Sequence, residues 1–365
     1  MSLTAGIVGL PNVGKSTLFN AITKQHILAA NYPFATIEPN VGTVTVPDKR
    51  LEFLDKLYIP KSLVPTTFEF TDIEGLVKGA SKGEGLGNKF LSHIREVDAI
   101  CEVVRCFEND NITHVEGTID PVRDIEIINV ELMIADLEVI ENRINRIGKK
   151  AMMSKDKETL KEVEVLQKIK SCLEQNKPVR TLEFTDEELK IIKVFNLLTL
   201  KPIIYIANIE ETDLNKTNKY VEILKEYASK ENSEVITLCA KIESELSELN
   251  DEEKAFFLQD LGIEESGLSK LIKSAYSLLG LKTFFTAGTD EVRAWTFRDG
   301  MKAPNCAGII HTDFERGFIK AEIMSFEDLE KYGSEKEVKE NGKMRLEGKE
   351  YIMKDGDICY FRFNV

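Results

Sequence analysis

The residues with the clearest capacity for chemistry lie near the start of the chain, in the run Gly9-Leu10-Pro11-Asn12-Val13-Gly14-Lys15-Ser16-Thr17. The apolar residues 5–8 before this run predict a buried strand, and residues 18–22 after it predict a helix. In that context the spacing is typical of a phosphate-binding loop (P-loop), whose backbone N–H groups face a polyanion. We expect Lys15 to reach the β- and γ-phosphates of a nucleoside triphosphate, and the Ser16 hydroxyl to bind Mg²⁺.

A second motif, Asp72-Ile73-Glu74-Gly75, follows the strand predicted at 67–71. Because ligands bind at the carboxyl ends of strands in open α/β sheets, we expect Asp72 to lie near the P-loop. Asp72 can hold Mg²⁺ through water, and the backbone N–H of Gly75 can contact the γ-phosphate. The glycine-rich stretch 79–88 is expected to change conformation when phosphate and metal bind, the alternative being a surface loop without function.

The strands and helices that must position these motifs alternate along the chain. Further strands are predicted at 43–46, 99–104, 202–207 and 234–238. With the intervening helical segments they predict an α/β fold with a mainly parallel sheet, of the P-loop NTPase type.

Two further regions interrupt or follow that pattern. Apolar residues at helical spacing on either side of a break at 152–156 predict an antiparallel coiled-coil hairpin: Leu137, Ile140, Ile144 and Ile147, then Leu160, Val163, Leu166, Ile169 and Leu173. Thr185 is expected to begin another helix through a capping box. After Gly280, short strands are predicted at 283–288 and 292–297, and two more around an Asp-Gly turn within 351–363. The expected domains are 1–121 with 201–280, 122–200, and 281–365.

Composition restricts the class of protein. A chain of 365 residues is long enough for two or three domains. The net charge of −14 argues against broad non-specific nucleic-acid binding, although a local basic face is compatible with it. No apolar run reaches the roughly eighteen residues of a membrane span, and no signal peptide is evident. The six scattered cysteines are expected to be reduced and buried, so a cytoplasmic protein is predicted.

These motifs, in this order, resemble the YchF branch of the Obg-like ATPases, within the translation-factor-related P-loop GTPases. The resemblance covers essentially the whole chain, and it rests most strongly on GLPNVGKST at 9–17, NYPFATIEPN at 31–40, DIEGL at 72–76 and NIEE at 208–211. It implies a G domain, a helical insertion, a C-terminal TGS domain of β-grasp type, and binding to the ribosome or its subunits, RNA and protein.

By position, the resemblance also implies a set of site residues. The nucleotide contacts would be Asn12, Val13, Gly14, Lys15, Ser16 and Thr17. Thr36 would bind Mg²⁺ beside Ser16, and 72–75 would form switch II. The base would be read at Asn208, Ile209 and Glu211, with the Cys239-Ala240-Lys241 loop behind it.

The base-reading segment departs from the guanine pattern Asn-Lys-x-Asp. Ile209 stands in place of the Lys, and Glu211 in place of the Asp. The extra methylene of Glu211 displaces the carboxylate that would pair with guanine N1–H and N2–H₂, and unpaired buried groups discriminate strongly. Adenine can instead be read by backbone groups and the Asn208 side chain. We therefore expect ATP to be preferred over GTP, as the resemblance also implies; a loosened GTP site is the alternative.

Hydrolysis is expected to be slow without a partner. Leu76 follows the Asp-x-x-Gly motif where Ras-like enzymes carry a water-orienting Gln, and leucine cannot form hydrogen bonds. His114, in the loop 109–114, is the candidate for a water-orienting group, the alternative being an ordinary surface histidine. The sequence leaves open whether a potassium ion near Asn12 takes the place of an arginine finger.

The expected function is a Mg²⁺-dependent ATPase that binds ATP and ADP, switches conformation and acts on ribosomes as a cytoplasmic monomer. Alternatives are a nucleotide-sensing interaction protein with incidental turnover, and a GTPase of ribosome assembly. The C-terminal module carries scattered basic residues, with Trp295 and Phe297 among them: Lys282, Arg293, Arg298, Lys302, Arg316 and Lys320. The two interpretations of this set are contact with phosphate and an ordinary solvated surface.

Overall fold

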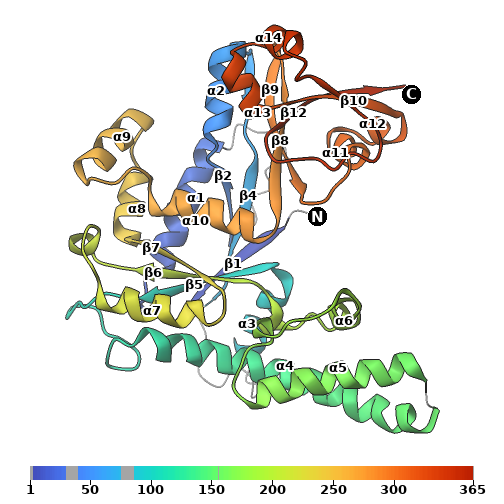
Figure 1. The fold of residues 1–365 in the computed structure, drawn as a ribbon. Coiled ribbons are helices and arrows are strands. Elements are labelled where there is room, and N and C mark those ends of the chain that lie inside the picture. The colour runs from blue at the N-terminus through green and yellow to red at the C-terminus, as the bar shows by residue number, and fades with distance from the viewer. Residues whose placement is uncertain (1–2, 30–39, 75–85, 155, 365) are drawn as a thin grey trace. The chain divides into compact units, whose positions relative to one another are not determined.

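A computed structural model describes residues 3–29, 40–74, 86–154 and 156–364 (Figure 1). The chain divides into two compact units. The first comprises Met1–Val44 and Glu69–Leu271, and the second comprises Thr45–Phe68 and Ile272–Val365. In the described part of the chain, no helix is both long enough and apolar enough to cross a membrane.

The first unit contains a six-stranded sheet with the order β2-β4-β1-β5-β6-β7. The strands are β1 (Thr4–Gly9), β2 (Val41–Thr45), β4 (Thr67–Asp72), β5 (Ala99–Arg105), β6 (Ile203–Asn208) and β7 (Glu234–Leu238). From β4 to β7 every neighbouring pair is parallel, and β5 and β6 are buried along their whole length. Parallel strands bring their carboxyl ends to one edge, so the segments after β1, β4, β5 and β6 converge there.

The helices of this unit cover the sheet and extend away from it (Figure 1). They are α1 (Lys15–Ala29), α3 (Leu86–Glu96), α4 (Pro121–Ser154), α5 (Lys157–Glu174), α6 (Asp186–Ile192), α7 (Lys219–Ser229), α8 (Ala240–Leu246) and α9 (Asp251–Asp260), with α10 (Gly267–Leu278) leading into the second unit. Short 3₁₀ turns lie at η2 (Val179–Thr181), η3 (Lys193–Phe195), η4 (Leu198–Leu200) and η5 (Glu211–Asp213).

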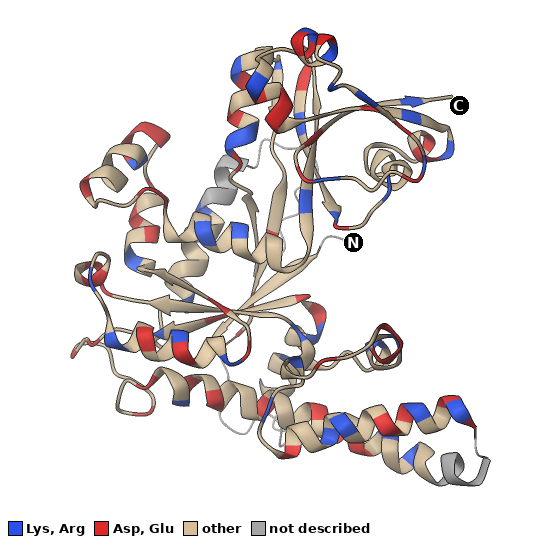
Figure 2. Cartoon of the chain, viewed as in Figure 1, with Lys and Arg blue, Asp and Glu red and all other residues tan. Residues whose placement is uncertain are grey.

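The predicted helical hairpin is confirmed as α4 and α5. Its buried residues include Ile140, Ile147, Leu166 and Ile169, and charged residues of both signs lie along the two helices (Figure 2). Leu160 is an exception, because it lies in the first turn of α5 and is 42% exposed. Periodicity identifies the apolar face of a helix, but not the point at which its partner ceases to cover that face. The predicted capping box is also present, with the Thr185 hydroxyl and the side chain of Glu188 bonded to each other's backbone N–H.

The second unit contains a mixed sheet with the order β11-β10-β12-β8-β9-β3. Its strands are β3 (Ser62–Val64), β8 (Leu281–Ala287), β9 (Glu291–Arg298), β10 (Phe318–Ser325), β11 (Arg345–Glu347) and β12 (Asp357–Phe363). Its helices are α2 (Lys49–Tyr58), α11 (Ala303–Ile310), α12 (Thr312–Arg316), α13 (Phe326–Tyr332) and α14 (Glu335–Glu340). The mixed pairing agrees with the β-grasp type expected for this module, and its designation as a TGS domain stays a prediction.

The prediction of two strands around the turn at 355–356 is wrong. Only β12 forms, whereas Ile352 makes an isolated bridge to Lys302. The buried Asp357 carboxylate accepts hydrogen bonds from the Lys354 backbone N–H (2.9 Å) and the Tyr351 hydroxyl (2.8 Å). These bonds curl the segment before β12 into a turn, and β12 pairs instead with β10 and β8.

The segment 45–68 belongs to the second unit, although the sequence analysis placed it in the nucleotide domain. Leu51 and Leu54 of α2 are buried in the same cluster as Phe285 and Val292. Strand β3 pairs in parallel with β9, and such long-range pairing leaves no local sequence signal. The division into three functional domains otherwise stays a prediction.

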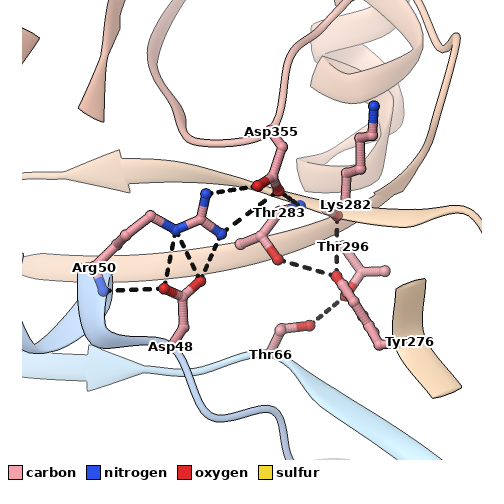
Figure 3. Close-up of polar contacts among 8 residues, drawn as sticks. All are labelled: Asp48, Arg50, Thr66, Tyr276, Lys282, Thr283, Thr296 and Asp355. Atoms are coloured by element: carbon pink, nitrogen blue, oxygen red, sulfur yellow. Dashed lines mark hydrogen bonds and ion pairs between the residues drawn. The ribbon is translucent and has the colours of Figure 1, made fainter. Parts of the chain in front are cut away.

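Polar contacts also join segment 45–68 to the rest of the second unit (Figure 3). The Arg50 guanidinium donates to Asp48 and to Asp355, the latter at 2.7 Å. The hydroxyls of Thr66 and Thr296 are hydrogen-bonded, and the Tyr276 hydroxyl contacts Thr296 at 3.0 Å. Residues more than 200 positions apart in sequence are thus joined by both packing and hydrogen bonds.

Glu102 is an acidic residue in the middle of β5 and only 1% exposed. Among the described residues its Oε2 atom has no hydrogen-bond partner. Nearby, the Arg180 guanidinium contacts Glu231 at 2.9 Å. Burial raises the pKa of Glu102 well above the ordinary value, and the Arg180 charge opposes this only partly.

Glu102→Gln is therefore expected to stabilise the protein in alkaline buffer. Near the ordinary value of 4.5 the unfolded chain begins to lose this proton while the folded chain keeps it, so wild-type stability falls as pH rises. Ionising Glu102 in the folded protein costs about 1.4 kcal/mol of stability for each unit by which its pKa is raised. Thermal unfolding across a pH series should show a gain for the variant that shrinks toward pH 4.5. A gain independent of pH would contradict this explanation.

Candidate nucleotide-binding site

The P-loop connects β1 to α1 through two residues with positive φ, Asn12 (65°) and Gly14 (95°). A Cβ atom at Gly14 would lie 2.2 Å from the Asn208 amide nitrogen. That nitrogen donates to the Val13 carbonyl at 2.8 Å, and the Asn208 side-chain oxygen accepts from the Ala240 N–H at 2.9 Å. The turns after β1, β6 and β7 are therefore tied together by one side chain.

This geometry adds a positioning role to the one predicted for Asn208. The residue is only 5% exposed, and its amide nitrogen and oxygen each bond to the backbone of a neighbouring loop. An amide has a second N–H and a second lone pair, so the expected contact of Asn208 with a base stays a prediction. Sequence could not reveal the positioning role, because the two partners lie 195 and 32 residues away.

Gly14→Ala is expected to impair the fold of the loop. A non-glycine residue at this φ costs about 1–3 kcal/mol, and the new methyl would displace Asn208 from Val13. Affinity for nucleotide should fall roughly tenfold for each 1.4 kcal/mol lost. Gly148→Ala is the matched control, because its Cβ would meet open space within α4 and should stabilise by about 0.5–1 kcal/mol. Equal stability and affinity for both variants would contradict the argument.

Lys15 and Asp72 are brought together across the sheet edge, from the start of α1 and the end of β4. The Lys15 ammonium forms an ion pair with Asp72, and their side chains are 11% and 21% exposed. Ser16 and Thr17 follow Lys15 on α1 and are exposed. The oxygen donors of Ser16 and Asp72 are of the type that Mg²⁺ prefers, so these residues fit a magnesium site. Thr36, Gly75 and most of the stretch 79–88 lie outside the described residues.

The expected base-reading segment lies beside the β7–α8 turn. Glu211 is exposed and its Oε2 lies 3.4 Å from the Lys241 ammonium. Ile209, Cys239 and Ala240 are buried, so the Ile209 side chain faces the protein interior. These residues are adjacent, as the sequence analysis expects of a base and the loop behind it, and their contact with nucleotide stays a prediction.

A pocket of about 360 Å³ opens next to this segment, with acidic, aromatic and amide groups in its wall. It is lined on one side by 106–108 after β5, and on the other by Glu210, 212–213 and 217–220. The wall at 106–108 was not predicted from the sequence. Its position directly after a buried strand, at the edge where ligands bind, is the signal that could have indicated it.

The loop 107–114 that follows β5 is held by Arg105. This arginine is 1% exposed, and its guanidinium donates to the carbonyls of Phe107 (3.2 Å), Asn109 (3.3 Å) and Ile112 (3.0 Å). The loop also contacts the P-loop, because the Asn12 side chain donates to the Thr113 carbonyl at 3.1 Å. A conformational change in the 107–114 loop can therefore be transmitted to the P-loop, and the reverse.

His114 is neither a surface residue nor free to bind water in this conformation. Its side chain is 3% exposed, and its Nε2 lies 2.8 Å from an oxygen of Asp124. Its Nδ1 accepts the Glu116 backbone N–H at 3.1 Å. The alternative of an ordinary surface histidine is wrong, because the side chain is buried and both ring nitrogens have partners within the protein, one of them on α4.

The basic residues expected on the C-terminal module are partly neutralised. Lys282 pairs with Asp299 at 2.7 Å, and Lys302 pairs with Glu350 at 2.5 Å. The Arg293 guanidinium lies over the Trp295 ring, 4.1 Å from its centroid. Together these contacts favour a solvated surface over a dedicated phosphate-binding patch.

Comparison with known proteins decides the family. A model described as "50S ribosome-binding GTPase" matches residues 4–142, and the YchF GTPase C-terminal model, described as a protein of unknown function, matches 281–364. The protein named "Ribosome-binding ATPase YchF" from Bacillus subtilis (strain 168) is 62% identical over 367 residues, covering 100% of both chains. The chain belongs to the YchF family of Obg-like ATPases.

The similarity to YchF-family proteins also holds for relatives of lower identity. "Obg-like ATPase 1" of Rattus norvegicus is 48% identical, covering 100% of this chain and 93% of its own. The solved structure of the Schizosaccharomyces pombe YchF GTPase has a TM-score of 0.90 and 43% identity, covering 99% of this chain and 98% of its own. The expected family and the P-loop α/β fold with a YchF C-terminal domain are confirmed.

Proposed function

We propose that this YchF-family protein is a Mg²⁺-dependent ATPase that hydrolyses ATP to ADP and phosphate and works on the ribosome. The observation that carries the proposal is the convergence of Lys15 and Asp72 at the sheet edge, beside a P-loop fastened by Asn208. The ATPase and ribosome-binding names of full-length relatives supply the substrate and the partner.

The roles of the residues follow from their types. Backbone N–H groups of 12–17, at the N-terminus of α1, would hold the phosphates, and Lys15 would exchange Asp72 for the β- and γ-phosphates. Ser16, Thr36 and Asp72 would hold the metal, and the Gly75 N–H would contact the γ-phosphate. Bound Mg²⁺ would neutralise charge on the phosphate oxygens. A rate that depends on KCl but not on NaCl would support a potassium contribution, for which Asn12 is the candidate residue.

We propose His114 as the group that orients the attacking water, because Leu76 cannot do so. His114 adjoins Thr113, whose carbonyl contacts the P-loop residue Asn12. The Glu116 N–H must first leave the His114 Nδ1 atom, which requires the 114–117 turn to open. A slow intrinsic rate, raised by a partner that opens this turn, follows from that requirement.

Purine selection is proposed to rest on the Asn208 side chain, on backbone groups around 208–211 and on the neighbouring pocket. Glu211 carries one methylene more than the Asp of the guanine pattern, which disfavours the bidentate pairing that guanine needs. Competition between ATP and GTP for the magnesium-loaded protein tests this directly. ATP should displace a fluorescent nucleotide at lower concentration than GTP, and the reverse order would favour the ribosome-assembly GTPase.

The ribosome is proposed as the partner, and the cytoplasm as the location, with the protein a monomer. Single-turnover hydrolysis measured with and without ribosomes tests the partner, and light scattering tests the monomer. Ribosomes should accelerate turnover. If they bind but leave the rate unchanged, the protein is better described as a nucleotide sensor whose turnover is incidental.

A further inference from the structure

A buried aspartate and histidine are paired close to the P-loop. His114 lies in the loop after β5, and Asp124 lies in the first turn of α4. Their side chains are each 3% exposed, and the Nε2 to Oδ2 distance is 2.8 Å. The other Asp124 oxygen accepts from the Arg123 guanidinium at 3.0 Å, so the carboxylate is held on both sides.

The hydrogen bonds define which ring nitrogen carries the proton. The Glu116 backbone N–H can only donate, so the His114 Nδ1 atom must be the acceptor. The proton of the neutral imidazole is therefore on Nε2, directed at Asp124. When the Glu116 N–H withdraws, Nδ1 presents a lone pair that can accept a hydrogen bond from water.

The two partners have different structural supports. Asp124 is on a helix of 34 residues, whose N-terminal dipole favours a carboxylate in the first turn. His114 follows a loop whose carbonyls are fixed by Arg105. The Glu116 N–H contact lies within a short turn, which the Gly117 N–H also closes by donating to the His114 carbonyl at 3.1 Å. Asp124 is anchored by the helix and by Arg123. The Asp124 contact is thus the one expected to persist when the turn opens.

We propose that Asp124 is a positioning residue that holds His114 with its proton on Nε2, which leaves Nδ1 to orient the attacking water. The inference rests on the proposed ATPase activity and on the role of His114 in it. It places Asp124 as the third group in a water–histidine–carboxylate arrangement, in which the carboxylate orients the base and touches neither water nor nucleotide.

The test compares ATP hydrolysis by wild type, His114→Ala, Asp124→Asn and the double variant of the full-length protein, with and without ribosomes. His114→Ala should lower kcat about 10²-fold or more. Asp124→Asn, which favours the wrong tautomer, should lower kcat at least about tenfold and leave the affinity for ATP unchanged. In the His114→Ala background, Asp124→Asn should have no further effect, because Asp124 acts only through the histidine.

Asp136→Asn is the matched control, because Asp136 is a fully buried carboxylate further along α4 that bonds to the backbone N–H groups of Leu198 and Thr199. It should lower the melting temperature without changing kcat. NMR of isotope-labelled histidine in the wild-type protein supplies a readout that needs no variant. With four histidines in the chain, the His114 signal can be assigned and should show the Nε2–H tautomer.

Three results would overturn the proposal. These are a wild-type kcat for Asp124→Asn, an equal slowing by Asp124→Asn in both backgrounds, and an Nδ1–H tautomer of His114. If His114→Ala is as fast as wild type, the catalytic role of His114 fails and the positioning role fails with it. If wild type hydrolyses no ATP under any condition, the proposed function itself fails. If His114→Ala hydrolyses ATP slowly while Asp124→Asn hydrolyses it at the wild-type rate, only the positioning role of Asp124 is rejected.

Discussion

Replacing Lys15 with alanine is expected to reduce ATP hydrolysis by about 10²–10³-fold, because the ammonium that stabilises charge on the transferred phosphate is lost. The affinity for ATP should fall as well, since Lys15 contacts the phosphates in the ground state too. Removing Lys15 also leaves Asp72, which is only 21% exposed, without its ion-pair partner. Steady-state kinetics, nucleotide titration and thermal unfolding measure the three effects separately.

Lys24→Ala is the control for this prediction. Lys24 lies on the same helix, α1, and its ion pair with Glu248 is exposed, with 42% and 64% of the two side chains accessible. Surface pairs of this kind contribute about 0–1 kcal/mol, so hydrolysis should be unchanged. If Lys15→Ala and Lys24→Ala had equal rates, the assignment of the nucleotide site at the P-loop would be untenable.

A chain shortened to end at Gly280 is expected to be poorly soluble, although this position was predicted to be a domain boundary. Segment 45–68 would remain while the sheet that it packs against is removed. The buried Leu51 and Leu54 of α2 would become exposed, and β3 would lose its pairing with β9. Each large apolar side chain left in water forfeits about 1.5–3 kcal/mol. Light scattering and dye binding to apolar surface provide the measurement.

A second shortened chain supplies the contrast. It ends at Gly280 and also replaces 45–68 with a short turn, which the adjacency of β2 and β4 in the sheet permits. This chain should be soluble and should bind nucleotide. If the first chain were equally soluble, the attachment of 45–68 to the second unit would contribute little to stability.

Features encoded by contiguous residues could be predicted from the sequence. The P-loop is one, because its chemistry requires a fixed spacing from Gly9 to Ser16. The capping box at Thr185 and the helices on either side of 155 are others, because caps and periodicity act within a few turns. The convergence of Lys15 with Asp72 followed from a general rule, that parallel strands place their carboxyl ends at one edge.

Features that depend on distant partners could not be predicted. The role of Asn208 depends on Val13, and the burial of His114 depends on a carboxylate presented by the next helix. Strand β10 was not predicted from the sequence. It pairs with β12, whereas a partner strand within 351–363 was expected. In each case the sequence shows which group is present, whereas the fold determines which partner it meets.

The placement of 45–68 in the second unit also has a consequence for protein synthesis. The apolar side chains of α2 leave the ribosome early, but β8 and the strands after it emerge roughly 220 to 300 residues later, about 11–60 s at 5–20 residues per second. Throughout that interval the nascent segment lacks the surface that finally covers it. Its apolar side chains therefore stay exposed until the last strands are made, and slower translation lengthens that exposure.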